Sequence, residues 1–334
     1  MLRLNDRLEA ICSCVPAGGV VADIGSDHGF LPVALYERGI SAAVIVSDAK
    51  TGPLDRAREN ISRLAPGAAF DFRLGDGLEV LGRGEADTVI IAGMGGLLIQ
   101  RLISADLDKA LSVRRFVLQP RNAPDALRRW LCGNGFRLVD ERLAREGRFI
   151  CEIMAAVPAG ARIGASRGPE GGGADAGPEG GGSHAAGDGG WPAGGGAGAA
   201  GDGCRLAGGG ADAGPEGGGS DAAGDGGWPA GGGSGAAGDG GRPAGSGADA
   251  GRAADPRYRQ IEAALSECGL EFEISPLLLY KGDPLALPFI LKKIRIEEKI
   301  AQELMDAGAK AGPRLEELSA RLEALKKAAR LAGG

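Results

Sequence analysis

A glycine-rich segment, residues 158–255, limits where this chain can build a folded core. The phrase ADAG begins at Ala174, Ala211 and Ala248, so the segment repeats at an interval of 37 residues. Aliphatic side chains are almost absent from it, and a segment with so little apolar surface cannot offset the entropy lost on folding. We therefore predict that this segment is disordered. Two folded regions are predicted to flank it, residues 1–157 and residues 256–334.

Short aliphatic runs alternate with stretches of helical spacing in the first of these regions. Val20–Ile24 predicts a buried strand, and four further runs predict strands: Ala43–Ser47, Asp71–Leu74, Thr88–Ala92 and Arg115–Gln119. Helices are predicted from about Phe30, over Pro53–Leu64 and over Asp125–Asn134. Two closing strands are predicted at Phe136–Ala144 and Phe149–Val157. This alternation is typical of an α/β fold, a doubly wound parallel sheet with helices on both faces.

The second region, residues 256–334, has a helical pattern. YRQIEAALSEC predicts one helix, LPFILKKIRIEEKIAQELMDA a long second helix and RLEELSARLEALKKAARLA a long third helix. In the third, Leu315, Leu318, Leu322 and Leu325 follow steps of three and four residues and form a narrow apolar stripe. The two long helices are therefore predicted to form an antiparallel α-helical hairpin of coiled-coil type.

Charge and hydropathy restrict the surroundings in which the chain works. Its net charge of −6 argues against non-specific nucleic-acid binding by the whole chain but leaves room for a local basic face. The N-terminal residues lack a signal peptide, and no apolar run approaches the roughly 20 residues that span a bilayer. The six cysteines match no zinc-binding spacing. We expect a cytoplasmic protein without a metal or a membrane association, and the oligomeric state is left open.

Four predicted loops share one edge of the sheet, because parallel strands end together and ligands bind beyond their carboxyl ends. The first loop follows the first strand and combines glycines with acidic and polar side chains. The next two loops carry carboxylates, and the fourth carries glycines. The residues expected to bind a cofactor are Asp23, Gly25, Ser26, His28, Gly29, Asp48, Asp76, Gly77, Ala92 and Gly93.

The acidic residues of these loops discriminate between two nucleoside cofactors. NAD requires a G-x-G-x-x-G loop, but Asp27 stands at the middle position between Gly25 and Gly29. A carboxylate repels a pyrophosphate, whereas it attracts a sulfonium and an ammonium group. We therefore predict S-adenosylmethionine, with Asp48 on the ribose hydroxyls and Asp76 on the adenine amino group. Taken singly, the glycines fit an ordinary tight turn and Asp48 fits a helix cap, so the prediction depends on their combination.

Five motifs follow one another in residues 2–157: VADIGSDHGFLP, TGPLDRARENI, RLGDGLEVL, ADTVIIAGMGGLLI and VLQPRNAPDALRRWL. They resemble the bacterial TrmK family, the tRNA (adenine(22)-N(1))-methyltransferases. The C-terminal helices resemble that family's coiled-coil domain more loosely, and the glycine-rich segment is a departure from the family pattern. The resemblance implies a class I methyltransferase domain with a Rossmann-like fold over residues 1–157.

The resemblance also implies methyl transfer to N1 of an adenine, adenine 22 in the D-arm of tRNA. The N1 lone pair needs no strong base, and a nearby carboxylate would stabilise the cationic product. The target base must first be flipped or unpaired. The residues assigned to catalysis are Asp27, Met94, Gly95 and Gly96. Asp27 has a simpler alternative role as a cap of the following helix.

Further residues are assigned to the RNA. Arg121 and Asn122, beside Gln119, follow the fifth strand, where they could equally be ordinary turn residues. Arginines that flank this strand form one basic cluster: Arg114, Arg115, Arg121, Arg128 and Arg129. On the long second helix of the C-terminal region, Lys292, Arg295 and Lys299 follow helical steps and share a face that could track phosphates. The alternative for that face is plain solvation, since acidic residues intervene.

Two other functions stay open on the sequence alone. One is a methyltransferase that acts on a protein or a small molecule. The other is a non-catalytic RNA-binding protein with the same fold. The acidic and glycine positions of all four loops favour an enzyme over the second of these.

Overall fold

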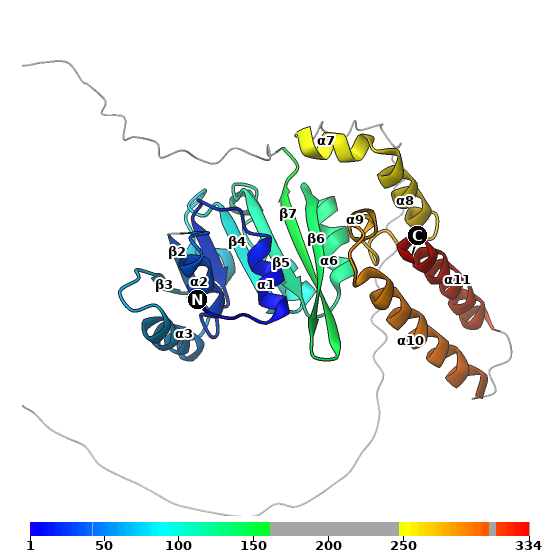
Figure 1. The fold of residues 1–334 in the computed structure, drawn as a ribbon, viewed down its shortest axis with the longest axis horizontal. Helices are drawn as coiled ribbons and strands as arrows, with labels where there is room; N and C mark the ends of the chain where they lie inside the picture. Colours follow the sequence, from blue (N-terminus) through cyan, green and yellow to red (C-terminus); the bar gives the residue numbers. More distant parts are fainter. Residues whose placement is uncertain (42, 161–246, 307–311, 334) are drawn as a thin grey trace, which may run out of the picture. The chain divides into compact units, whose positions relative to one another are not determined.

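A computed structural model describes residues 1–41, 43–160, 247–306 and 312–333 of the chain (Figure 1). These residues belong to one compact unit. Most of the glycine-rich segment lies outside the described residues, and the prediction that it is disordered falls there. At its C-terminal end the predicted boundary is wrong, because Gly247–Ala254 forms a helix, α7.

The sheet has seven strands in the order β3-β2-β1-β4-β5-β7-β6. Their bounds are Val21–Ile24 (β1), Val44–Asp48 (β2), Asp71–Leu74 (β3), Thr88–Met94 (β4), Arg115–Pro120 (β5), Phe136–Glu146 (β6) and Phe149–Pro158 (β7). The first five are parallel, and β7 runs antiparallel to both β5 and β6. The order reverses between β1 and β4, which is the switch point where doubly wound sheets bind ligands. The predicted fold is thereby confirmed.

The first region contains six α-helices and one short 3₁₀ helix among its described residues. Their bounds are Asp6–Ser13 (α1), Phe30–Glu37 (α2), Thr51–Leu64 (α3), Gly77–Val80 (η1), Gly96–Ser104 (α4), Leu107–Ala110 (α5) and Pro124–Gly133 (α6). The sequence did not predict α1. Its start is fixed by Asn5, whose side chain accepts a hydrogen bond from Leu8 N at 2.9 Å.

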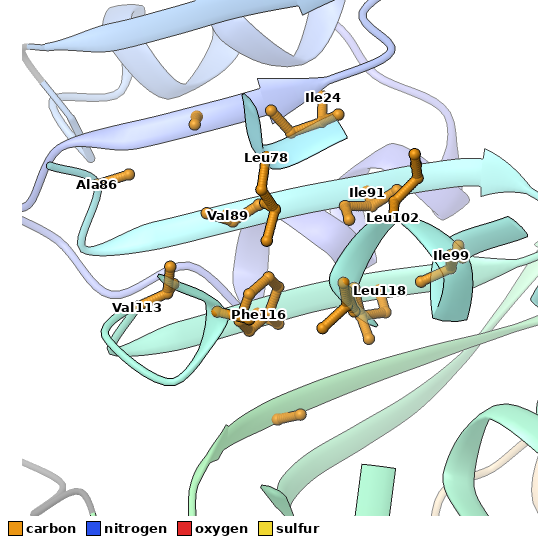
Figure 2. Packing of buried hydrophobic residues seen from close by; sticks show 14 of the residues in the cluster. Ile24, Leu78, Ala86, Val89, Ile91, Ile99, Leu102, Val113, Phe116 and Leu118 are labelled. Carbon is orange, nitrogen blue, oxygen red and sulfur yellow. The ribbon is translucent and has the colours of Figure 1, made fainter. Parts of the chain in front are cut away.

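Side chains on the two faces of the sheet form separate hydrophobic clusters. On β4, Val89 and Ile91 belong to a cluster that includes Ile99 and Leu102 of α4 (Figure 2). Ile90, between them, belongs to a cluster with α1 and α2. All three β4 residues are fully buried. The alternation follows from the strand period of two, and it explains why β4 reads as a continuous aliphatic run.

Among its described residues the C-terminal region contains helices and connecting turns but no strands. Besides α7, its helices are Pro256–Ser266 (α8), Pro276–Lys281 (α9), Ala286–Asp306 (α10) and Pro313–Gly333 (α11). The predicted stripe of α11 is confirmed in part: Leu318 and Leu325 are buried, and Leu325 shares a cluster with Ile290 and Ile294 of α10. Coiled-coil geometry stays a prediction. The same cluster includes Leu143 of β6, so the helices pack on the sheet.

A buried charged cluster also joins this helical region to the sheet. Arg128 of α6 donates to Glu141 of β6 at 2.7 Å and to Glu152 of β7 at 2.6 Å. It donates a further bond to the carbonyl of Phe272 at 3.0 Å, and the hydroxyl of Ser275 donates to Glu141. Arg128 and Glu141 are each 1% exposed, so Arg128 is not part of a basic surface, contrary to the prediction.

Candidate functional site

Backbone hydrogen bonds hold the ends of the parallel strands side by side. The amides of Gly25 and Ser26, after β1, donate to the carbonyl of Ser47 in β2 at 2.8 and 2.9 Å. The amide of Gly75, after β3, donates to the carbonyl of Asp48 at 3.0 Å. The predicted carboxylates of the second and third loops therefore belong to adjacent strand ends.

The loops after β4 and β5 extend the same edge. The amide of Arg121 donates to the carbonyl of Met94 at 2.7 Å, and the side-chain Nε of Arg121 donates to the carbonyl of Gly93 at 2.9 Å. Gly93 in turn donates its own amide proton to Oε1 of Gln119 at 3.2 Å. The structure thus brings together all of the loops from which the sequence predicts a site.

Gly25 and Met94 meet at the switch point. The backbone of Gly25 has a φ of +78°, and a Cβ built on it would lie 2.2 Å from Cε of Met94. The positive φ is what favours a glycine here, because side chains rarely adopt it, while the terminal methyl group of Met94 lies over the residue. Met94, which the sequence assigns to catalysis, therefore lies against the predicted cofactor loop after β1.

Four other predicted site glycines have packing reasons for being glycine. A Cβ on Gly29 would lie 2.7 Å from Ile61 of α3, and one on Gly77 would lie 2.9 Å from Leu102 of α4. A Cβ on Gly96 would lie 2.6 Å from the carbonyl oxygen of Ala123. Gly95 likewise approaches Oδ1 of Asn122, which accepts a hydrogen bond from the amide of Gly96 at 3.1 Å. Asn122 thus has a structural role between the β4 and β5 loops.

The carboxylates of the predicted cofactor loops differ in burial. Asp23 lies at 6% exposure within β1, and burial raises its pKa to about 6. The Ser26 hydroxyl and the charge of Arg7 oppose this shift, and the charge of Asp48 adds to it. Asp48 is half-buried, and its Oδ1 accepts from the amide of Lys50 at 2.8 Å. In the part of the chain that the structure describes, Asp48 has no ion-pair partner. Asp76 is exposed and lies 3.3 Å from a guanidinium nitrogen of Arg101.

Asp27 is held by two basic side chains. Its Oδ1 accepts from Nε and from a terminal nitrogen of Arg56 at 3.2 and 2.6 Å. Its Oδ2 lies 3.3 Å from Nε2 of His28, whose ring stacks on Phe30 with centroids 5.6 Å apart. The hydrogen bond from Arg56 holds the pKa of Asp27 below its ordinary value. Asp27 is therefore an exposed carboxylate that stays ionised at neutral pH.

The sequence missed two arginines at this edge, Arg56 and Arg7. Arg7, on α1, donates to Oε1 of Gln119 at 3.2 Å and to Oε1 of Glu146 at 2.8 Å. Arg7 and Gln119 are 112 positions apart in the chain. No local motif connects residues so far apart, whereas Arg56 stands within the TGPLDRARENI motif and could have been considered with it.

The predicted RNA-contacting residues of α10 lie in one groove. Lys292, Arg295 and Lys299 line it together with Arg145 and Arg148 of the β6–β7 hairpin, which the sequence missed. The neighbouring Lys293 instead pairs with Glu273 at 3.1 Å. Arg121 is exposed at the edge described above. Of the other predicted basic residues, Arg114 pairs with Asp87 at 3.2 Å and Arg129 lies over the ring of Phe272.

None of the described helices has the length and apolar character that crossing a membrane requires. Within the described ranges, no group of three or more histidine, cysteine or acidic side chains could hold a metal ion.

Comparisons with known proteins bear on this arrangement. A family model for a methyltransferase domain matches residues 4–154. A tRNA (adenine(22)-N(1))-methyltransferase of Bacillus subtilis is 36% identical over 155 residues, which are 46% of this chain and 65% of that protein. A Mycoplasma genitalium protein named "Putative tRNA methyltransferase MG248" is 31% identical over 155 residues, 45% of this chain and 68% of that protein. The match thus spans about two thirds of these relatives.

Solved structures agree on the fold. The crystal structure of the Bacillus subtilis m1A22 tRNA methyltransferase TrmK superposes with a TM-score of 0.59 at 21% identity, covering 98% of this chain and 100% of that one. The sequence similarity, the matched methyltransferase domain and the shared fold together show that the chain belongs to the TrmK family.

Proposed function

We propose that this protein is a cytoplasmic, S-adenosylmethionine-dependent tRNA methyltransferase that methylates N1 of adenine 22 in the D-arm. The observation that carries the proposal is the edge of acidic and glycine loops at the switch point. Asp23 lies one residue before the end of β1, Asp48 ends β2 and Asp76 follows β3. Relatives support the substrate, since the Bacillus protein is named for this reaction. A related structure from Streptococcus pneumoniae is a complex with S-adenosyl-L-methionine.

The residues of the edge fit this cofactor by their chemistry. Asp48 has one oxygen, Oδ1, in a local backbone hydrogen bond and no ion-pair partner among the described residues, so its Oδ2 can accept from ribose hydroxyls. Asp76 is exposed next to it, where its carboxylate can accept from an adenine amino group. When bound, S-adenosylmethionine supplies an electrophilic methyl group on a sulfonium. Buried Asp23 adds negative potential that favours this positive charge.

Asp27 is the candidate for stabilising the reaction product. Attack by the N1 lone pair makes the adenine cationic, so a fixed carboxylate nearby lowers the energy of the transition state. Arg56 keeps Asp27 ionised and in one orientation through two hydrogen bonds. Gly95 and Gly96 bring the β4 loop against the β5 loop, where Arg121 can contact the RNA. These residues orient the base and exclude water, while the N1 lone pair performs the attack.

Mass spectrometry of nucleosides tests the proposal directly. Unmodified tRNA incubated with the protein and S-adenosylmethionine should gain 1-methyladenosine, and a transcript with guanine at position 22 should not. Asp27→Asn should lower the single-turnover rate by about a hundredfold to a thousandfold, the range for removing a group that acts electrostatically in the transition state. Transfer to a protein, with none to tRNA, would support the alternative methyltransferase. Cofactor binding without transfer to any acceptor would support the non-catalytic alternative.

A further inference from the structure

A basic groove lies where the β6–β7 hairpin meets α10. Its basic residues are Arg145 and Arg148 from the hairpin and Lys292, Arg295 and Lys299 from the helix. Ile150, Pro288 and Ile296 complete the lining, and the cavity measures about 440 Å³. The groove combines two segments that are far apart in the sequence, and Figure 1 shows the hairpin formed by β6 and β7 and the long helix α10.

The positive charge of this groove is largely uncompensated. Among the described residues, neither the two hairpin arginines nor Lys292 nor Arg295 has a carboxylate partner. Lys299 lies 3.6 Å from Glu303, and both of these side chains are mostly exposed, so this pair has little strength. Like charges held together repel one another. In a chain with a net charge of −6, such a cluster indicates a polyanionic partner.

An exposed aromatic ring stands at the same place. Phe149, at the hairpin tip, is 53% exposed. The guanidinium carbon of Arg148 lies 5.0 Å from its ring centroid, and Nζ of Lys292 lies 5.4 Å from it. A compact anion such as free phosphate would contact only the cations and not this ring. An unpaired nucleic-acid segment would contact both, because its bases stack on aromatic rings while its phosphates contact the flanking cations.

The groove lies at the same edge of the sheet as the candidate site. Because β7 is antiparallel to β5 and pairs Met154 with Leu118, its first residues run past the carboxyl end of β5. Phe149 is five positions from Met154, and Pro120 is only two from Leu118, so the hairpin tip extends about 10 Å further. Arg7 links the two places by contacting both Gln119 and Glu146.

We propose that this basic groove binds the ribose-phosphate backbone of the RNA substrate beside the target nucleotide, with an unpaired base stacked on Phe149. The inference rests on the proposed function and deepens it. It adds Arg145, Arg148 and Phe149 of the β6–β7 hairpin to the three α10 residues predicted from sequence. The binding surface is then a composite of both regions of the protein, and neither the hairpin nor the helix alone provides it.

The test measures tRNA affinity at several salt concentrations, together with S-adenosylmethionine affinity. Arg145→Ala/Arg148→Ala should weaken tRNA binding about tenfold and lower the slope of log affinity against log salt by roughly 1.4–1.8, for two lost phosphate contacts. Phe149→Ala should weaken binding about fivefold or more but leave the slope unchanged. Cofactor affinity should not change in either variant. Lys326→Ala/Lys327→Ala on α11 removes the same charge away from the groove lining and should leave all three quantities unchanged.

The outcomes separate this proposal from the proposed function. If the hairpin variant binds tRNA with the same affinity and salt slope while the unmutated protein methylates tRNA, the groove proposal is wrong and the function stands. If the α11 control loses as much affinity as the hairpin variant, the binding is diffuse and the groove proposal is also wrong. If the unmutated protein binds tRNA through the groove but methylates no tRNA, the function fails and the groove proposal stands.

Discussion

Two clusters of charged side chains on the same sheet differ in their surroundings. At the carboxyl edge, Asp27 is held by Arg56 and His28, and all three side chains are about half exposed. Under the C-terminal helices, Arg128 is held by Glu141 and Glu152, and these side chains are almost completely buried. Both clusters contain a short arginine–carboxylate contact of 2.6 Å, so geometry alone does not distinguish them.

The two clusters differ in how much free energy it costs to separate the arginine from its carboxylates. An exposed pair gains little from its contact, because water solvates both partners equally well when they separate. A buried pair cannot separate without leaving a charge in an apolar environment. We therefore expect the Asp27 cluster to be free to serve a ligand, and the Arg128 cluster to hold the helices on the sheet.

The largest effect is expected at the buried cluster. Arg128→Met leaves Glu141 and Glu152 buried without a cation and should lower the free energy of unfolding by about 3–5 kcal/mol. Arg56→Ala, the matched change in the exposed cluster, should cost less than about 1 kcal/mol. Urea denaturation followed by circular dichroism measures both. If both variants lose the same free energy of unfolding, burial does not distinguish the two clusters and the prediction is wrong.

Removing the acceptors as well sharpens the same test. In Arg128→Met/Glu141→Gln/Glu152→Gln no buried charge is left, so most of the lost stability should return. If the triple variant is no more stable than Arg128→Met, the loss comes from packing around the arginine stem rather than from unpaired charge.

A second effect concerns Asp23, a buried carboxylate to which no arginine among the described residues donates a hydrogen bond. Its folded-state pKa of about 6 lies above the ordinary 3.8, so ionisation disfavours the folded state. The penalty is absent below about pH 4, grows up to about pH 6 and then stays constant, because the folded protein binds the proton more tightly. Asp23→Asn should therefore stabilise the protein at pH 7.5 by up to about 3 kcal/mol and have little effect at pH 4. Equal unfolding midpoints at pH 7.5 would contradict this.

The third effect is on ligand binding rather than on stability. Asp48→Ala should weaken S-adenosylmethionine binding by about 1–3 kcal/mol, the range for lost charge-assisted hydrogen bonds. Asp55→Ala, an exposed acidic residue on α3, removes the same charge and should leave the affinity unchanged. Isothermal titration calorimetry measures the S-adenosylmethionine affinity of both variants. An unchanged affinity in Asp48→Ala would remove this residue from the ribose.

The smallest effect is expected from the glycine-rich segment. Replacing residues 161–246 by a short flexible linker should leave cofactor affinity and thermal stability almost unchanged, because the segment lacks core-forming side chains. A short linker can reach, since β7 and α7 both approach β6: Pro158 pairs with Phe136, and Arg252 donates to the carbonyl of Val139 at 3.1 Å. A drop of several degrees in melting temperature would show that the segment stabilises the folded regions.

The sequence predicts the central strands β1, β2, β4 and β5 well because they are largely buried on both faces. Such strands need aliphatic residues at consecutive positions, and β4 and β5 begin at the predicted residues. The short helix α9 was missed although Ser275 and Pro276 form a good helix start, because six residues give too little periodicity to detect. Helix α7 was missed because its composition matches the glycine-rich segment, while a tertiary contact of Arg252 stabilises it.

The loops of the candidate site were predictable because strand ends and glycines are local signals. The partners of their charged residues were not. Asp27 and Arg56 are 29 positions apart, and Arg128 and the Phe272 carbonyl are 144 apart. The sequence grouped Arg128 with surface arginines because helical spacing does not reveal which face of α6 meets the C-terminal helices. Only the fold separates an arginine that faces water from one that faces two glutamates.

The place where the glycine-rich segment leaves the fold has a consequence for how such a protein can evolve. Strand β7 runs antiparallel to β5, so its last residue, Pro158, lies beside the start of β5, at the amino edge of the sheet. The candidate site occupies the opposite edge. Tandem repeats of 37 residues are prone to gain and lose copies when a gene is replicated, and here each such event alters chain length at a distance from the loops of the candidate site. Lineages of this family should therefore differ widely in the length of this connection, and the same junction is a natural place to insert a reporter domain.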